Sequence, residues 1–188
     1  MRAISKAELA ALCESQGTEL KKSLALQREA LEALCGMINS DRASGRIIFG
    51  LAPDGTPVGV EPGNLDTAQR TLAESAKRWF DPPLHMTIDA IDCDGVKLII
   101  VEATRSPSVP LHEFDGRAFV REGSSKRRLG LDERTALTRR RDRASHPGPW
   151  RCTRCGILVG DLRAFEVTAT GMQRTFKCQC GGEYWPAS

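Results

Sequence analysis

The sequence predicts an α+β protein, with a mixed, largely antiparallel sheet, flanking helices and a small four-cysteine β module. Through residues 1–143, β-hairpin signals are interspersed with amphipathic helix patterns, which favours this class over a doubly wound fold. The last 39 residues hold four of the seven cysteines and five of the ten aromatic residues. We therefore expect a main domain over 1–143, a linker over 144–149 and a separate module over 150–188, because two prolines and a glycine interrupt the chain between them.

Capping residues and apolar periodicity define the first elements of the main domain. Ser5 and Glu8 form a capping box that predicts a short helix. A strand is expected from residue 18 to 24. Apolar residues at i, i+3, i+4 and i+7 then predict an amphipathic helix that includes residues 31–38. The continuous apolar run at 47–51 is typical of a central strand that is buried on both faces.

Turn signals organise the remainder of this domain. Asp54-Gly55 favours a hairpin turn. A helix over 66–80 follows, capped by an aspartate and ended by two prolines. Two strands within 86–104 flank a second Asp-Gly turn. A last strand is expected at 117–121, and a last helix begins at Asp132.

Composition sets limits on the class of protein. The chain has 188 residues, of which 40% are hydrophobic and 27% charged, as expected for a globular protein in water. The longest aliphatic run, at 98–101, is far too short to span a bilayer, and charged residues interrupt any N-terminal signal pattern. The scattered and paired cysteines without such a signal indicate a reducing, cytoplasmic setting and no membrane partner.

Charge is distributed unevenly along the chain. The formal net charge is +3, but residues 121–143 contain nine Lys/Arg and four Asp/Glu and so carry +5, leaving −2 for the remainder. A basic strip on a neutral-to-acidic body suits contact with a polyanion through one defined surface.

Three residues near the amino terminus form a candidate catalytic group. Glu19 and Lys21 are two apart, so on a strand they point from one face, and Gly17 offers a turn that can bring Glu14 back over the strand. Two carboxylates forced together repel, and a divalent cation relieves that repulsion. The alternative is a solvated helix end followed by a charged edge strand.

Three segments, in this order, resemble one known family. They are Glu14-Ser15 … Glu19-Leu20-Lys21, then residues 37–60 with Gly45-Arg46-Ile47-Ile48-Phe49-Gly50-Leu51 and Asp54-Gly55, and finally Asp115-Gly116-Arg117-Ala118-Phe119-Val120-Arg121-Glu122-Gly123-Ser124-Ser125. Together they resemble the Schlafen AlbA-like domain over roughly residues 13–133. The resemblance implies the fold of a Schlafen AlbA-like lobe.

The resemblance also implies a site. In members that cleave RNA, paired glutamates and an aspartate after the glycine-ended strand hold a metal ion, which implies Glu14, Glu19 and Asp54 here as ligands of Mg²⁺ or Mn²⁺. Lys21 matches the lysine of the family's first motif and would offset charge in the transition state. For Lys21 a solvated strand lysine remains the alternative. For Asp54 it is a plain turn residue.

The basic strip contains two groups of candidate nucleic-acid contacts. The first lies in or beside a glycine-serine turn, where free backbone N–H groups assist phosphate binding. The second closes the last predicted helix, where cations also complement the helix dipole. The residues are Arg121, Lys126, Arg127 and Arg128 in the first group and Arg139, Arg140 and Arg141 in the second.

The last 39 residues carry a metal-binding pattern. Cys152 and Cys155 form Cys-x-x-Cys, and Cys178 and Cys180 form Cys-x-Cys after 22 intervening residues. Four thiolates suit a tetrahedral, structural Zn²⁺. A β hairpin between the pairs would give a zinc ribbon-like module. Disulfides are the less favoured alternative in a reducing compartment.

The leading hypothesis is a metal-dependent nuclease, an endoribonuclease acting on structured RNA such as tRNA. RNA is favoured over DNA as the partner, and a homodimer is expected to rebuild the two-lobed groove of Schlafen cores. One alternative is a non-catalytic DNA- or RNA-binding regulatory protein. Another makes the zinc module the functional end and the first domain a dimerisation scaffold.

Overall fold

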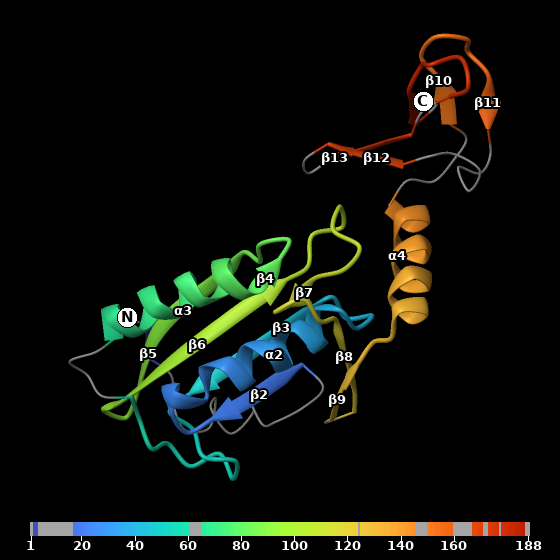
Figure 1. Ribbon diagram of the computed structural model, residues 1–188. Coiled ribbons are helices and arrows are strands. Elements are labelled where there is room, and N and C mark those ends of the chain that lie inside the picture. The colour runs from blue at the N-terminus through green and yellow to red at the C-terminus, as the bar shows by residue number, and fades with distance from the viewer. Residues whose placement is uncertain are drawn as a thin grey trace. The chain divides into compact units, whose positions relative to one another are not determined.

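The chain folds into two compact units, Met1–Leu137 and Thr138–Ser188 (Figure 1). The computed structural model describes residues 2–3, 17–60, 65–123, 125–145, 150–159, 167–170, 173–176 and 178–186. The predicted helix at Ser5 and most of the predicted linker lie outside these residues. Among the helices that are described, none is long and apolar enough to cross a bilayer.

A five-stranded sheet organises the first unit. Its order is β1-β5-β6-β3-β2, with β5 and β3 antiparallel to β6 and the two edge strands parallel to their neighbours. This confirms the α+β class with a largely antiparallel, mixed sheet. The strands are β1 (Arg2–Ala3), β2 (Thr18–Lys21), β3 (Ser44–Phe49), β5 (Met86–Cys93) and β6 (Val96–Thr104).

The central strand β3 is buried on both faces, as its apolar run predicts. Ile47 and Phe49 belong to the main core, whereas Ile48 packs in a second cluster on the opposite face. Helices α2 (Gln27–Ile38) and α3 (Leu65–Trp79) supply the main core with their apolar stripes, so both cover the same face of the sheet (Figure 1). Each fully buried aliphatic or aromatic side chain contributes about 1.5–3 kcal/mol by leaving water.

The two Asp-Gly turns behave differently. Asp94 and Gly95 both have positive φ, 52° and 85°, which gives the two-residue turn that joins β5 to β6. The turn at Asp54 closes a single bridge between Leu51 and Pro57, and no strand follows it within residues 51–60. The sequence signal was therefore right about the turn and wrong about the second strand.

Short paired segments flank the sheet. A 3₁₀ turn, η1 (Leu24–Leu26), leads into α2, and β4 (Phe80–Asp81) pairs with β7 (Glu113–Phe114). β8 (Phe119–Glu122) pairs with β9 (Ser125–Arg128), whose described side chains are all exposed. Helix α4 (Leu131–Ser145) follows, and the boundary between the two units falls within it.

The second unit contains two small sheets. β10 (Trp150–Cys152) lies between β11 (Leu158–Val159) and β14 (Tyr184–Pro186), and all pair antiparallel. β12 (Val167–Thr170) and β13 (Gln173–Phe176) form a hairpin. Trp150, Cys152 and Tyr184 make the buried core of this unit.

Candidate nucleic-acid interface and metal centre

Glu19 and Lys21 lie on one face of β2 and contact each other. Their strand pairs in parallel with β3, opposite Ile47 and Phe49. The Lys21 Nζ lies 2.9 Å from Glu19 Oε1 and 2.6 Å from Glu29 Oε1. Burial acts to lower the pKa of Lys21, but hydrogen bonds to Glu29 and Glu19 outweigh it and leave that pKa raised. The shared face predicted from residue spacing is therefore present.

Arg121 occupies the other side of the Glu19 carboxylate. Its Nη1 donates to Glu19 Oε2 at 2.6 Å, and its side chain is only 2% exposed. Arg121 Nε and Nη2 are buried and have no hydrogen-bond partner among the described residues. Both oxygens of Glu19 thus already contact a cation. Arg121 was expected at the surface against phosphate, and this burial points instead to a role in holding Glu19.

The other two predicted metal ligands, Glu14 and Asp54, are not found beside Glu19 among the described residues. Glu14 lies outside the described residues. Asp54 is exposed, and its Oδ1 accepts the Thr56 N–H at 2.9 Å, a bond that lowers the pKa of Asp54. Within the described part of the chain, the only group of three or more potential metal ligands is the cysteine cluster.

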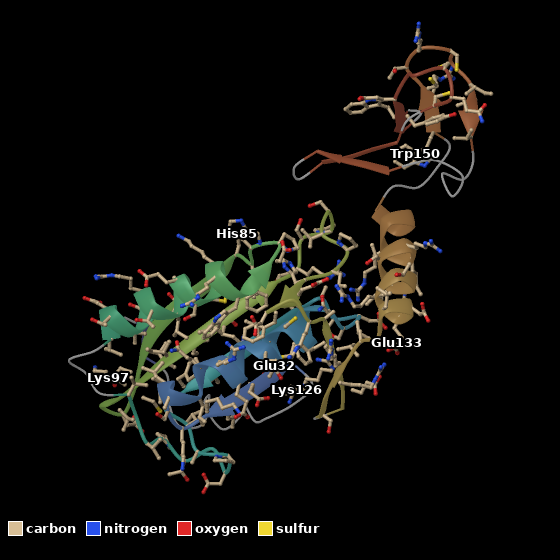
Figure 2. All side chains as sticks on the ribbon, in the orientation of Figure 1. Glu32, His85, Lys97, Lys126, Glu133 and Trp150 are labelled. Atoms are coloured by element: carbon tan, nitrogen blue, oxygen red, sulfur yellow. The ribbon has the colours of Figure 1, made fainter. Side chains whose placement is uncertain are left out.

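The predicted basic strip on β9 is exposed and partly ion-paired. Lys126 Nζ lies 2.7 Å from Glu32 Oε1 of α2 (Figure 2), and Arg127 bridges Glu122 and Glu133 at 2.9 and 2.7 Å. The side chain of Arg128 is exposed.

The second group of predicted contacts lies on the part of α4 that belongs to the second unit. Arg139 and Arg140 are exposed, whereas Arg141 is buried.

Asn39, the residue that follows the end of α2, links α2 to β8. Its Nδ2 donates to the carbonyls of His112 and Phe119 at 2.8 and 3.0 Å, and its Oδ1 accepts the His112 N–H at 3.0 Å. These bonds fix the start of β8 beside α2, two residues before Arg121. A polar residue at the end of an apolar helix stripe was the available signal.

His112 is buried behind Asn39. Its Nδ1 lies 2.8 Å from the Pro82 carbonyl oxygen. Because a carbonyl only accepts, Nδ1 carries the proton in that bond. Burial lowers the pKa of His112. His112 therefore has a structural role: it packs the segment before β7 against Phe80 and the Pro82 carbonyl.

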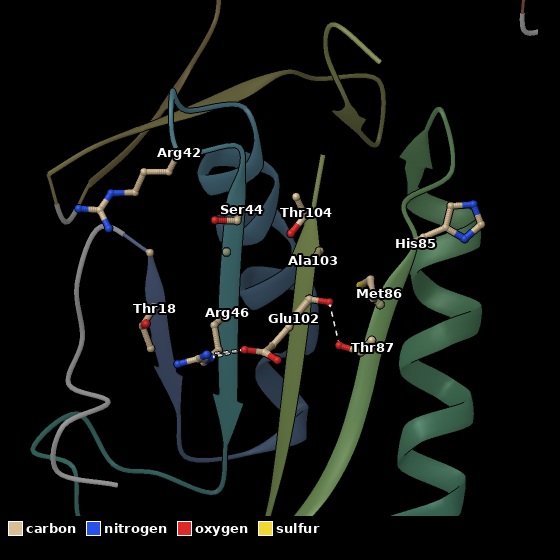
Figure 3. A pocket seen from close by; sticks show the side chains of 12 residues that line it. Thr18, Arg42, Ser44, Arg46, His85, Met86, Thr87, Glu102, Ala103 and Thr104 are labelled. Carbon is tan, nitrogen blue, oxygen red and sulfur yellow. Dashed lines mark hydrogen bonds and ion pairs between the residues drawn. The ribbon is translucent and has the colours of Figure 1, made fainter. Parts of the chain in front are cut away.

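A polar hollow of about 680 Å³ lies on the face of the sheet opposite α2 and α3 (Figure 3). Hydroxyls of Thr18, Ser44 and Thr104 line it, and Arg46 Nε donates to Glu102 Oε1 at 2.7 Å across it. No sequence pattern predicts this hollow, because residues from four strands, which only the fold brings together, contribute to its lining.

The four cysteines of the second unit converge as predicted. Their sulfur atoms all lie within 4.8 Å of one another, with Cys152–Cys180 at 3.5 Å and Cys155–Cys178 at 3.7 Å. A tetrahedral ion with Zn–S bonds of about 2.3 Å would place the sulfurs about 3.8 Å apart. The donor set and spacing are therefore compatible with a structural Zn²⁺.

Hydrogen bonding and backbone turns around the four cysteines favour metal binding. Tyr184 Oη donates to Cys178 Sγ at 3.3 Å and is the main cause that lowers the pKa of Cys178 to about 6, which favours the thiolate that binds metal. Gly156 and Gly181 have positive φ, 73° and 81°, and let the backbone turn around the sulfurs. A Cβ added to Gly182 would lie 2.7 Å from Cys152 Sγ.

One protein family matches most of the first unit. Residues 14–130 match the family described as Schlafen, AlbA_2. No curated protein matches the chain.

The solved structures that are similar to the chain include the following two. One is the N-terminal domain of a RecG-related protein from Nitrosomonas europaea, with 23% identity and a TM-score of 0.48, covering 67% of this chain and 91% of that one. The other is the DIP2311 protein from Corynebacterium diphtheriae, with 15% identity and a TM-score of 0.48, covering 73% of this chain. The match spans only 26% of that protein's length.

Proposed function

The chain belongs to the Schlafen AlbA_2 family, a family related to nucleic acids, and on this premise we propose that it binds nucleic acid through the β8–β9 hairpin. The observation that carries the proposal is that β9 presents Lys126, Arg127 and Arg128 on an exposed strand. Clustered cations of this kind neutralise phosphates, which supply most of the affinity in sequence-independent binding. RNA is favoured over DNA, in keeping with the RNA-cleaving members of the family.

The ion pairs that the hairpin already makes with acidic residues are compatible with phosphate binding. The side chains of Arg127 and Glu122 are 45% and 60% exposed. An ion pair at such a surface contributes only about 0–1 kcal/mol. A phosphate can therefore replace Glu122 as the partner of Arg127 at little cost.

Salt dependence of binding tests the proposal. The affinity of the full chain for a labelled RNA duplex is measured by anisotropy at several salt concentrations. Lys126→Ala and Arg128→Ala should each weaken binding and reduce the slope of log K against log salt by about 0.7–0.9 for each phosphate that the variant no longer neutralises. Lys77→Ala, which removes an exposed lysine from α3, should change neither quantity. Equal slopes for all variants would contradict the proposal.

A second candidate function is metal-dependent cleavage of structured RNA such as tRNA. It is favoured by the contact between Glu19 and Lys21, the acid–lysine pair that such chemistry needs. Glu14, Glu19 and Asp54 would hold Mg²⁺ or Mn²⁺, and the ion would polarise the phosphate. In this arrangement the metal competes with Lys21 and Arg121 for the oxygens of Glu19.

Cleavage assays separate this candidate from binding without turnover. The protein is incubated with tRNA and Mn²⁺ beside Glu14→Gln and Glu19→Gln. A nuclease should lose activity in both variants, whereas a regulatory protein should bind RNA without cleaving it and without responding to divalent metal. Sedimentation of the same samples tests the proposed homodimer.

A further inference from the structure

The second unit carries two exposed apolar side chains in its three-stranded sheet. Leu158 and Trp185 are 51% and 59% exposed. Among the described residues of this unit, the buried core consists of three side chains, one of which is Trp150. The second tryptophan, Trp185, stays in water and can anchor a partner, because burying an aromatic ring is a major source of binding energy.

Strand register places Leu158 and Trp185 in one row on the same face of this sheet, with Arg151 between them. Arg151 of β10 pairs with Leu158 of β11 on one side and with Trp185 of β14 on the other. Directly opposed residues on antiparallel strands have Cβ atoms about 4.5–5.5 Å apart, so the three side chains are neighbours. Trp150 and Tyr184 alternate with them and are buried on the other face.

The charge of this face and unit suits a polyanion. Residues 138–188 contain nine Lys/Arg and four Asp/Glu, a formal net charge of +5. Arg151 is exposed at the centre of the row, flanked by two apolar neighbours rather than by acids. An aromatic ring beside an arginine is the arrangement on which single-stranded bases stack while the cation contacts the phosphate.

We propose that the Leu158–Arg151–Trp185 row binds single-stranded nucleic acid, with one base stacked on the Trp185 indole and Arg151 on the adjoining phosphate. The inference rests on the proposed function for the class of ligand but assigns a separate site in the other unit.

A protein partner fits this row less well. A stable protein interface needs about 800 Å² on each side, whereas strands of two and three residues present a narrow surface. One stacked base needs a single ring.

The test uses the zinc-loaded full chain and a labelled single-stranded oligouridine. Trp185→Ala should weaken binding by about 5- to 150-fold, the loss that corresponds to one stacked base, and Trp185→Phe should retain part of it. Tryptophan fluorescence should be quenched by the oligonucleotide in the wild type and not in Trp185→Phe. Val58→Ala, which shortens a side chain that is 55% exposed in the first unit, serves as the control. Measured zinc content shows that each variant is folded.

The outcomes separate this inference from the proposed function. If Trp185→Ala binds oligouridine as the wild type does while Lys126→Ala weakens duplex binding, the row is not the site and the hairpin proposal stands. If the wild type binds neither nucleic acid, both fail. A variant that binds oligouridine normally but sediments as a smaller species would assign the row to contact between copies of the chain and overturn the inference.

Discussion

The Glu19 carboxylate is held between two cations in a nearly water-free position. Lys21 contacts one oxygen and Arg121 the other, and the side chains of Glu19 and Arg121 are 11% and 2% exposed. Taking such charges out of water is costly, and their attraction repays the cost only while both partners are present. The pair is therefore a sensitive point of the first unit.

Substituting Arg121 tests how much the contact with Glu19 contributes to stability. Arg121→Met keeps the volume but leaves Glu19 with Lys21 alone, and we expect the free energy of unfolding to fall by about 3 kcal/mol. Urea unfolding followed by circular dichroism measures it. Arg128→Met makes the same chemical change on exposed β9 and should alter stability by less than about 0.5 kcal/mol. Similar losses in both variants would show that the Glu19 contact contributes little.

His112 should make stability depend on pH. Burial lowers its pKa in the folded protein below the ordinary value of 6.5. As pH falls through 6.5, the histidine is protonated in the unfolded chain before it is protonated in the folded protein. The free energy of unfolding therefore decreases as pH falls. Above 6.5 neither state is protonated and the effect vanishes.

The measurement compares unfolding midpoints between pH 7.5 and 5. His112→Asn retains a donor for the Pro82 carbonyl but cannot titrate, and it should show a flatter decline than the wild type. His85→Asn, at an exposed position, should decline as the wild type does. Parallel curves for wild type and His112→Asn would refute the prediction.

Residue spacing predicted some of these contacts and not others. Glu19 and Lys21 share a face because a strand has a period of two, which is visible in the sequence. The Glu19–Arg121 pair joins residues 102 positions apart. No local pattern encodes that contact, and the exposed neighbours of Arg121 in the sequence suggested a surface position.

Among the helices and strands, apolar periodicity was sufficient to predict those elements that bury one face against the core. The apolar stripe of α2 was visible as a period of 3.6, and the alternation at the start of β5 was visible as a period of 2. β9 was missed because Ser125–Arg128 is polar on both faces and is held by pairing with β8 rather than by burial. The junction at Asn39 was missed because its partners lie in a distant loop.

The turns that hold the cysteines depend on close backbone approach. A Cβ at Gly182 would lie 2.7 Å from Cys152 Sγ and 2.6 Å from Arg154 Cβ, closer than such atoms come. Gly182→Ala should therefore displace the sulfur and lower the zinc affinity at least about tenfold, the lower end of the loss seen when the surroundings of metal ligands are changed. Competition with a chromophoric chelator measures this affinity.

A matched substitution separates crowding from backbone strain. Gly156 has a positive φ but open space where its Cβ would lie. Gly156→Ala should cost about 1 kcal/mol of stability and leave the sulfur positions unchanged. If both alanine variants lose zinc equally, crowding at Cys152 is not the cause.

Across the protein as a whole, we expect the two units to differ in what stabilises them: apolar burial in the first and metal binding in the second. The first unit buries a large core between the sheet and two helices. Among the described residues of the second unit, the buried core consists of Trp150, Cys152 and Tyr184. Domains with so little buried surface usually need a metal or disulfides to fold, and the free thiols point to a metal.

Chelation should therefore unfold one unit and leave the other intact. With EDTA, backbone amides of β10 and β14 should lose protection from hydrogen exchange, because metal-binding energy in such modules is folding energy. Amides of β5 and β6, held by a core that does not include the four clustered cysteines, should keep theirs. Cys155→Ser should reproduce the loss without chelator, and added Zn²⁺ should restore protection only in the wild type. Protection of β10 that survives chelation would mean that packing alone folds the cysteine unit, and loss in β6 would mean that the two units unfold together.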